Sequence, residues 1–273
     1  MDFRTIEILS PAATLMLAAE LDRWRRVGEF RPNVLDVDEW NPEVRRLLFE
    51  MGLFDLLEVA NPPTPQPTAE SQRFVRFVTG RGARGEDAVA MRQAIEEVAG
   101  AVPERRGIYD GIVESMTNVV HHAYPDNGRY DVPVFTGTWW MAGSYDPTIR
   151  QLRILFYDQG VGFPATLPRQ SNWEQVRGLI KAVVPDDGAM IAAAFEWRRS
   201  SDGRRSRTGL KHRGRGLARI IGVVDSVTDG RVRILSGRGE YTYDRQAGGK
   251  ASNNPSALGG TLIQWELTLP SGP

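Results

Sequence analysis

The segment from Ile108 to Tyr124 constrains the fold more than any other part of the chain, because it carries two different stripes at helical spacing. Residues three or four apart lie side by side on a helix, so the apolar members form one core-facing stripe: Ile108, Ile112, Met116, Val119 and Ala123. Four polar residues follow another face: Asp110, Glu114, Asn118 and His122. The segment therefore predicts a core-facing helix that points a carboxylate and a carboxamide into one space. A solvated polar face is the alternative, and motifs further along the chain bear on that choice.

The composition excludes several kinds of chemistry. The 273 residues contain no cysteine, which rules out disulfides, thiol nucleophiles and thiolate metal sites. Lys and Arg together number 34, as do Asp and Glu, so net charge gives no argument for a nucleic-acid or membrane partner. The N-terminus shows no signal-peptide pattern, and no apolar run approaches the length of a membrane span. We therefore expect a soluble, cytoplasmic protein.

Residues 1–60 predict a small α/β adaptor domain. The expected strands are 5–9, 33–37 and 53–59, and the expected helices are 10–26 and 41–52, with Gly52 ending the second. This order of elements, with the run 47–53, loosely resembles the STAS domains of sigma-factor regulators. Residues 38–41 offer no Ser or Thr, so the phospho-acceptor role of those domains is not implied. The proline-rich segment 61–72 predicts a linker to a second domain, 73–273.

A glycine pattern follows the first strand of the second domain. Residues 73–79 predict a strand, and 80–85 match the dinucleotide fingerprint G-x-G-x-x-G. That fingerprint requires a second strand after the helix, whereas here a helix over 87–98 leads directly to another helix opening at Pro103. A strand-to-helix turn is the better interpretation. The chain also lacks a Walker-type phosphate loop.

A hairpin of strands 138–145 and 151–157 is expected next. Alternation places Leu152, Ile154 and Phe156 on one face, and Asp158 is the next residue on that face. An ionisable group at the end of an apolar row is costly to bury unless something pairs with it. Gly160 and Gly162 follow. The segment is therefore either a tight turn or a ligand site, in which the Asp158 carboxylate accepts a hydrogen bond from a ligand amine.

A long, irregular stretch, 165–207, separates this hairpin from a second glycine-rich turn. Helices are expected at 174–184 and 189–197, and a solvated basic loop at 198–207. The run 209–221 then enters an apolar helix, which suits a phosphate at the free backbone N–H groups. It also carries Lys211, Arg213 and Arg215. The last strands are expected at 223–228, 231–236, 240–243 and 261–269.

Four motifs in order resemble the GHKL (Bergerat-fold) ATPases, over roughly residues 73–270. They are E-x-x-x-N on a helix, D-x-G-x-G after a strand, G-x-G-L opening a helix, and G-G-T before the last strand. The run 118–124 is most similar to the histidine kinase and anti-sigma-factor kinase branch. The resemblance implies an α/β (α+β) two-layer sandwich, with a mixed sheet covered by helices on one face. Here it would follow the small α/β domain.

The resemblance also implies a role for each matching residue. Glu114 corresponds to the general base, Asn118 to the Mg²⁺ ligand, and Asp158 to the carboxylate that binds the adenine amino group. Gly160 and Gly162 would line the base pocket, and Thr261 would support the adenine-binding carboxylate. Further ATP contacts are expected on the phosphate side, from Lys211, Gly214, Gly216, Leu217 and His122. For the histidines 121 and 122, capping of the helix is left open beside a phosphate contact.

We therefore expect a regulatory protein that binds ATP and Mg²⁺, a serine/threonine protein kinase or switch of the anti-sigma-factor type with a protein partner. One alternative is a nucleotide-gated interaction module without turnover. Another is an ATPase that works through lid-driven dimerisation, and a homodimer is left open. The sequence does not decide whether the phosphoryl acceptor is water or a protein.

Overall fold

One open sheet runs through the protein, and the computed structural model describes residues 1–28, 33–60, 62, 64–66, 68–102, 105–130, 132–180, 184–199 and 216–270. Within these residues the sheet has five strands in the order β1-β2-β3-β5-β4. They are β1 (Arg73–Arg81), β2 (Thr138–Asp146), β3 (Gln151–Asp158), β4 (Gly230–Asp244) and β5 (Gly248–Thr268). All four neighbouring pairs are antiparallel, so the expectation of a mixed sheet is wrong.

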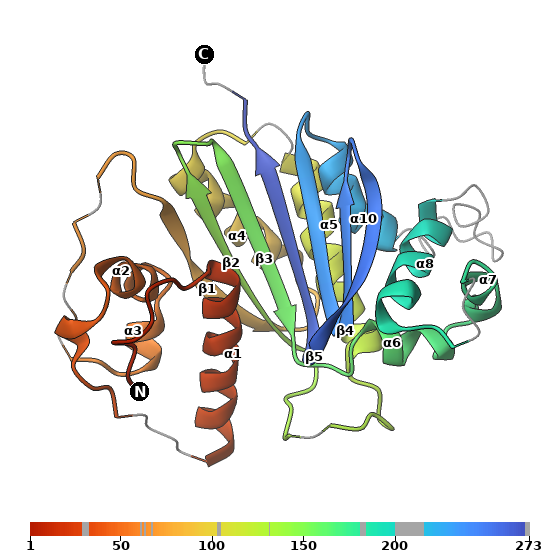
Figure 1. Ribbon diagram of the computed structural model, residues 1–273, viewed down its shortest axis with the longest axis horizontal. Helices are drawn as coiled ribbons and strands as arrows, with labels where there is room; N and C mark the ends of the chain where they lie inside the picture. The colour runs from red at the N-terminus through yellow and green to blue at the C-terminus, as the bar shows by residue number, and fades with distance from the viewer. Residues whose placement is uncertain are drawn as a thin grey trace.

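Helices α4 (Gly85–Ala99), α5 (Arg105–Asn118) and α10 (Gly216–Asp225) lie behind the sheet in Figure 1 and cover one of its faces. Helix α8 (Asp187–Arg199) joins the same core, where Phe195 stacks on Tyr241 of β4. The apolar stripe of α5 packs against alternate residues of β3, among them Ile154 and Phe156. Helices α5 and α10 cross closely, since a Cβ on Gly111 would lie 2.5 Å from Val223 Cγ2. Trp265 of β5 donates to the carbonyl of Ile220 at 2.8 Å. The expected core-facing helix is confirmed.

The N-terminal helices cover the opposite face (Figure 1). They are α1 (Pro11–Gly28), α2 (Pro42–Glu50) and α3 (Leu53–Leu56), with a 3-10 turn, η1 (Val37–Glu39). Ser10 caps α1 by accepting from the N–H of Ala13 at 3.1 Å. Buried side chains of these helices share a core with Trp140, Leu155 and Tyr157 of the sheet. The sheet is therefore covered on both faces, and not on one as expected.

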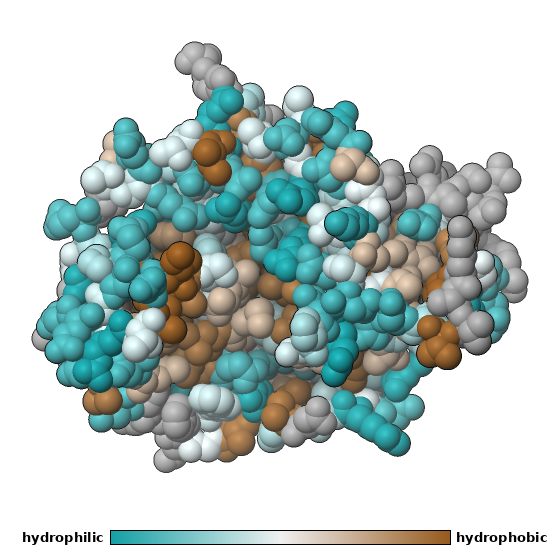
Figure 2. Space-filling view, in the orientation of Figure 1, coloured by the Kyte–Doolittle hydropathy of each residue, from teal (hydrophilic) through white to brown (hydrophobic). Residues whose placement is uncertain are grey.

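Hydropathy on this side of the molecule follows the same division (Figure 2). Hydrophobic residues gather around α1 and along its border with the sheet, whereas the surface over β4 and β5 is mostly hydrophilic. Charged residues there form ion pairs: Arg231 of β4 pairs with Glu266 of β5, and Arg233 pairs with Glu240 further along β4. The N-terminal helices thus occupy the apolar half of this face.

The strands expected in residues 1–60 are wrong, because that region is helical or irregular where it is described. A strand needs a free sheet edge to pair with, and these residues lie over a face instead. Residues 5–9 begin in a turn and continue without regular structure, and Ile6 and Leu9 pack on the N-terminal core. The apolar run from residue 53 forms α3, since a short apolar run does not distinguish strand from helix.

Most other elements agree with the expectations. The β2–β3 hairpin, β1 and α4 are confirmed, and the glycine pattern spans the end of β1, a connection over residues 82–84 and the start of α4. Residues 223–225 belong to α10, so the strand expected at 223–228 is wrong, and the two strands expected within 231–243 are one. The irregular stretch contains α6 (Phe163–Thr166), η3 (Leu167–Arg169), α7 (Trp173–Arg177) and α8 (Asp187–Arg199). Across the parts of the chain that the structure describes, no helix combines the length and apolar character needed to cross a bilayer.

We predict that Leu15→Ala destabilises the whole sheet and not the N-terminal helices alone. Leu15 is fully buried in the core that α1 shares with the sheet, and such a truncation costs about 2–5 kcal/mol. Urea unfolding, followed by tryptophan fluorescence and circular dichroism, should show one coincident transition shifted to lower urea. Val27→Ala, which changes a half-exposed residue of α1, should shift it little. Two separate transitions, with only the first shifted, would contradict the shared core.

Candidate functional site

Helix α5 delivers three polar side chains to one side of the sheet. Glu114 and Asn118 lie one turn apart, and the helix then continues as a single π-helical turn, η2 (Val119–Ala123), which carries His122. Glu114 is largely buried, with 12% of its side chain exposed. The Nδ2 atom of Asn118 is buried and has no hydrogen-bond partner among the described residues. Since buried amide groups are normally bonded, this atom suits a ligand acceptor.

Asp158 ends β3 and is almost fully buried, at 5% exposed. Its Oδ1 accepts from the N–H of Gly160 at 2.8 Å, and the backbone N–H of Thr261, its β5 neighbour, also donates to it. Burial raises the pKa of the Asp158 carboxyl to about 7, and these two hydrogen bonds offset only part of that effect. No cationic side chain of the described residues pairs with the carboxyl, which suits it to accept from a neutral donor.

The loop after Asp158 passes so close to other backbone that only glycine fits. A Cβ on Gly160 would lie 2.3 Å from the carbonyl oxygen of Ala123, which accepts from the N–H of Val161 at 2.8 Å. Gly162 has a φ of +81° and would meet Ser236 Oγ at 2.6 Å. The two glycines thus fix the loop against η2 and β4.

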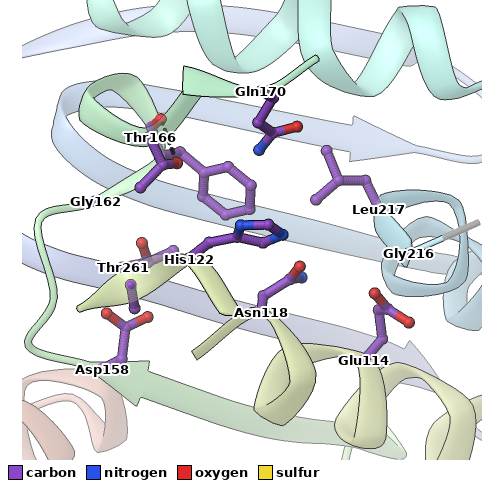
Figure 3. Close-up of a pocket in the computed structure, with 12 residues that line it drawn as sticks. Glu114, Asn118, His122, Asp158, Gly162, Thr166, Gln170, Gly216, Leu217 and Thr261 are labelled. Carbon is purple, nitrogen blue, oxygen red and sulfur yellow. Dashed lines mark hydrogen bonds between the residues drawn. The ribbon is translucent and has the colours of Figure 1, made fainter. Parts of the chain in front are cut away.

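These elements surround one cavity, drawn in Figure 3 with its side chains. Glu114, Asn118 and His122 rise from α5 and η2, Asp158 and Thr261 lie at one end, and Gln170 points in from the opposite wall. The full lining is Glu114, Asn118, His122, Ala123, Asp158, Gly162, Phe163, Thr166, Gln170, Gly216, Leu217 and Thr261.

A second, larger cavity continues from the first, with a volume of about 810 Å³ against about 130 Å³. The two share six lining residues: Glu114, Asn118, His122, Thr166, Gln170 and Gly216. Only the outer cavity is lined by His121, Arg169 and Arg219, whereas only the inner one is lined by Asp158 and Thr261. Together they form one groove with a carboxylate at its inner end and basic side chains at its outer end.

Glu114 meets α10 where that helix begins. A Cβ on Gly216 would lie 2.0 Å from Glu114 Oε1, so a side chain there would displace the carboxylate. Arg219, one turn into α10, lies 3.5 Å from Glu114 Oε2 through its guanidinium. The position of Glu114 therefore depends on the lack of a side chain at Gly216 and on the positive charge of Arg219.

A scan against protein-family models and a search of curated proteins find no match to this chain. Any function for the groove therefore has to follow from its own residues. Within the described ranges, no three His, Asp or Glu side chains are grouped to hold a metal ion. A hard cation here would need oxygens from a bound ligand beside Asn118.

The structure gathers most of the expected site residues. Glu114, Asn118, His122, Asp158, Gly162, Gly216, Leu217 and Thr261 all line the inner cavity. Gly160 does not line it and instead supports Asp158 through its N–H. Thr261 likewise supports Asp158 through backbone, while its hydroxyl lies 3.1 Å from that of Ser236. Lys211 and Gly214 lie outside the described residues, as do Arg213 and Arg215.

Sequence reasoning missed several residues around the two cavities, among them Phe163, Thr166, Gln170, Arg219 and Ser236. The first three follow the D-x-G-x-G motif in a stretch without periodicity, so no sequence signal marked them. Arg219 could have been found, because it lies three residues after Gly216 on a helix. Ser236 joins the loop to β5 by accepting from Phe163 N–H at 2.8 Å and donating to the Gly260 carbonyl at 2.9 Å.

We predict that Asp158→Asn removes a pH dependence of stability. The folded pKa of Asp158, about 7, lies above its ordinary value of 3.8, so the folded state holds the extra proton between those pH values. Wild-type stability should therefore fall as pH rises through this window, by about 4 kcal/mol at most. Denaturant unfolding from pH 4 to 8 measures it. Asp110→Asn, the same change outside the cavity, should keep the wild-type slope, and a D158N slope equal to wild type would refute the assignment.

Proposed function

We propose that the groove binds ATP with Mg²⁺, and that the chain is a cytoplasmic regulatory protein with a Bergerat-type ATP site. This proposal is carried by one observation: residues of four motifs that lie far apart in the sequence line the same cavity. Each motif contributes a group suited to one part of the nucleotide. A serine/threonine kinase or switch of the anti-sigma-factor type is the form of the proposal that the resemblance favours.

Asp158 suits the base end of the nucleotide. An adenine amino group can donate to its buried carboxyl, which pairs with no cationic side chain of the described residues. The loop through Gly162 brings backbone against that end of the cavity, while Leu217 adds an apolar side chain to the wall. The site would select adenine over a base that lacks this amino group, because such a base would leave the buried carboxyl of Asp158 without a hydrogen-bond donor.

Asn118 suits the metal and phosphate end. Its side chain offers one oxygen for a hard cation, and its buried Nδ2 can donate to a phosphate oxygen. Bound Mg²⁺ would supply charge neutralisation at the phosphates. Gly216 leaves room beside Glu114 at the start of α10, where free backbone N–H groups favour an anion. The basic residues of the outer cavity add to that preference.

Glu114 suits the general base. Its carboxylate can accept the proton of an attacking hydroxyl, from water or from a protein serine or threonine. The side chain lies between Asn118 and Arg219, so it borders the end of the groove where the terminal phosphate would lie. Burial limits access of bulk water to it, which favours an acceptor held in a defined position.

A second function, a nucleotide-gated module without turnover, has one observation in its favour. Arg219 lies within 3.5 Å of the carboxylate of Glu114, and a carboxylate beside a guanidinium is a weaker base. In such a module, bound nucleotide would set the shape of the groove and its surroundings, and Glu114 would position bound groups without acting as a base. Turnover measurements separate the two functions.

We predict that Asn118→Ala removes the magnesium dependence of ATP binding. Wild-type protein should bind ATP more tightly with Mg²⁺ than with a chelator, and the variant should lose about 10- to 100-fold of that gain. Isothermal titration calorimetry measures both. Asn118→Asp, which keeps an oxygen ligand, should retain the gain. If the wild type binds no ATP in the presence of Mg²⁺, the proposed function fails.

We further predict that Glu114→Gln abolishes turnover without abolishing binding. Loss of a general base should slow phosphate release or phosphotransfer by at least about 100-fold, with the ATP affinity nearly unchanged. Glu196→Gln, on the exposed side of α8, is the matched control. Wild-type protein that binds ATP without turnover would favour the gated module instead. Turnover that survives in E114Q would exclude Glu114 as the base.

A further inference from the structure

We propose that Gln170 binds a ribose hydroxyl of the nucleotide and makes the site selective for ribonucleotides. This inference rests on the proposed function. Gln170 follows η3, in a part of the chain that carries none of the four motifs. It lines both cavities, and Figure 3 shows its carboxamide directed into the space across from His122 and Asn118.

Gln170 lies at the junction of the groove. Asp158 borders only the inner cavity, while Arg169 and Arg219 border only the outer one. A nucleotide whose base contacts Asp158 and whose phosphates reach the basic end must place its ribose between them, because the ribose joins the base to the phosphates. Among the described residues of the irregular stretch, Gln170 and Thr166 border both cavities.

The chemistry of the side chain matches a hydroxyl better than a phosphate. A carboxamide both donates and accepts, as does a ribose hydroxyl, whereas phosphate oxygens only accept. The backbone N–H of Gln170 donates to the Leu167 carbonyl at 3.0 Å, which anchors the residue. No described residue hydrogen-bonds its carboxamide, so both of its polar atoms are available to a ligand. Thr166 is already committed, since its hydroxyl donates to the Phe163 carbonyl at 2.9 Å.

The test compares ATP with 2′-deoxy-ATP and 3′-deoxy-ATP, each with Mg²⁺, by calorimetry on the full chain. Wild-type protein should bind ATP about 3- to 10-fold more tightly than at least one deoxy analogue, the worth of one neutral hydrogen bond. Gln170→Ala should weaken ATP by that factor and leave the analogue unchanged, which closes a double-mutant cycle between side chain and hydroxyl. Gln175→Ala, the same change on exposed α7, should keep the wild-type ratio.

Two results would overturn the assignment while the proposed function stands. One is wild-type protein that binds ATP and both deoxy analogues equally. The other is Gln170→Ala weakening all three ligands by the same factor, which would indicate a phosphate contact. Wild-type protein that binds none of the three would remove the proposed function and this inference together.

Discussion

The contact between Ala123 and the loop after β3 holds the two halves of the groove together. The Ala123 carbonyl accepts from Val161, and Gly160 lies against it with no room for a Cβ. Tyr124 adds a second connection, because its hydroxyl donates to the Thr138 carbonyl at 2.9 Å and accepts from the Gln159 N–H at 3.0 Å. These hydrogen bonds set where the polar face of α5 lies relative to the carboxyl on β3, so every role assigned to the groove depends on them.

β3 serves two cores at once. Its even-numbered residues, such as Phe156, pack against α5, while Leu155 and Tyr157 pack against the N-terminal helices. The same helices reach the end of the strand, where Gln159 donates to Glu20 of α1 at 2.7 Å. The groove and the N-terminal helices are therefore supported by one strand. Gln159, which contacts Glu20, directly follows the buried Asp158.

The sequence predicts the parts of this structure that have a strong period. Helix α5 carries an apolar row on one face and its groove-lining polar residues on another, while the apolar row of β3 ends at Asp158, which also lines the groove. The N-terminal strands were predicted wrongly because residues 5–9 and 53–59 are short apolar runs, which fit any buried conformation. Gln170 and Ser236 escaped prediction for another reason: their importance comes from neighbours brought close only by the fold.

The π-helical turn from Val119 to Ala123 has a consequence for insertions and deletions. Its hydrogen bonds span one residue more than those of an α-helix, so the turn is equivalent to an α-helix with one inserted residue. Deleting one residue between Asn118 and Ala123 would restore a regular α-helix, and Ala123 and Tyr124 would keep their places beside Gly160 and Thr138, because a π-helical turn holds one residue more than the α-helical turn that it replaces. The same deletion in the regular part of α5 would instead rotate everything after it by about 100°. The segment therefore tolerates a one-residue deletion where the rest of the helix does not.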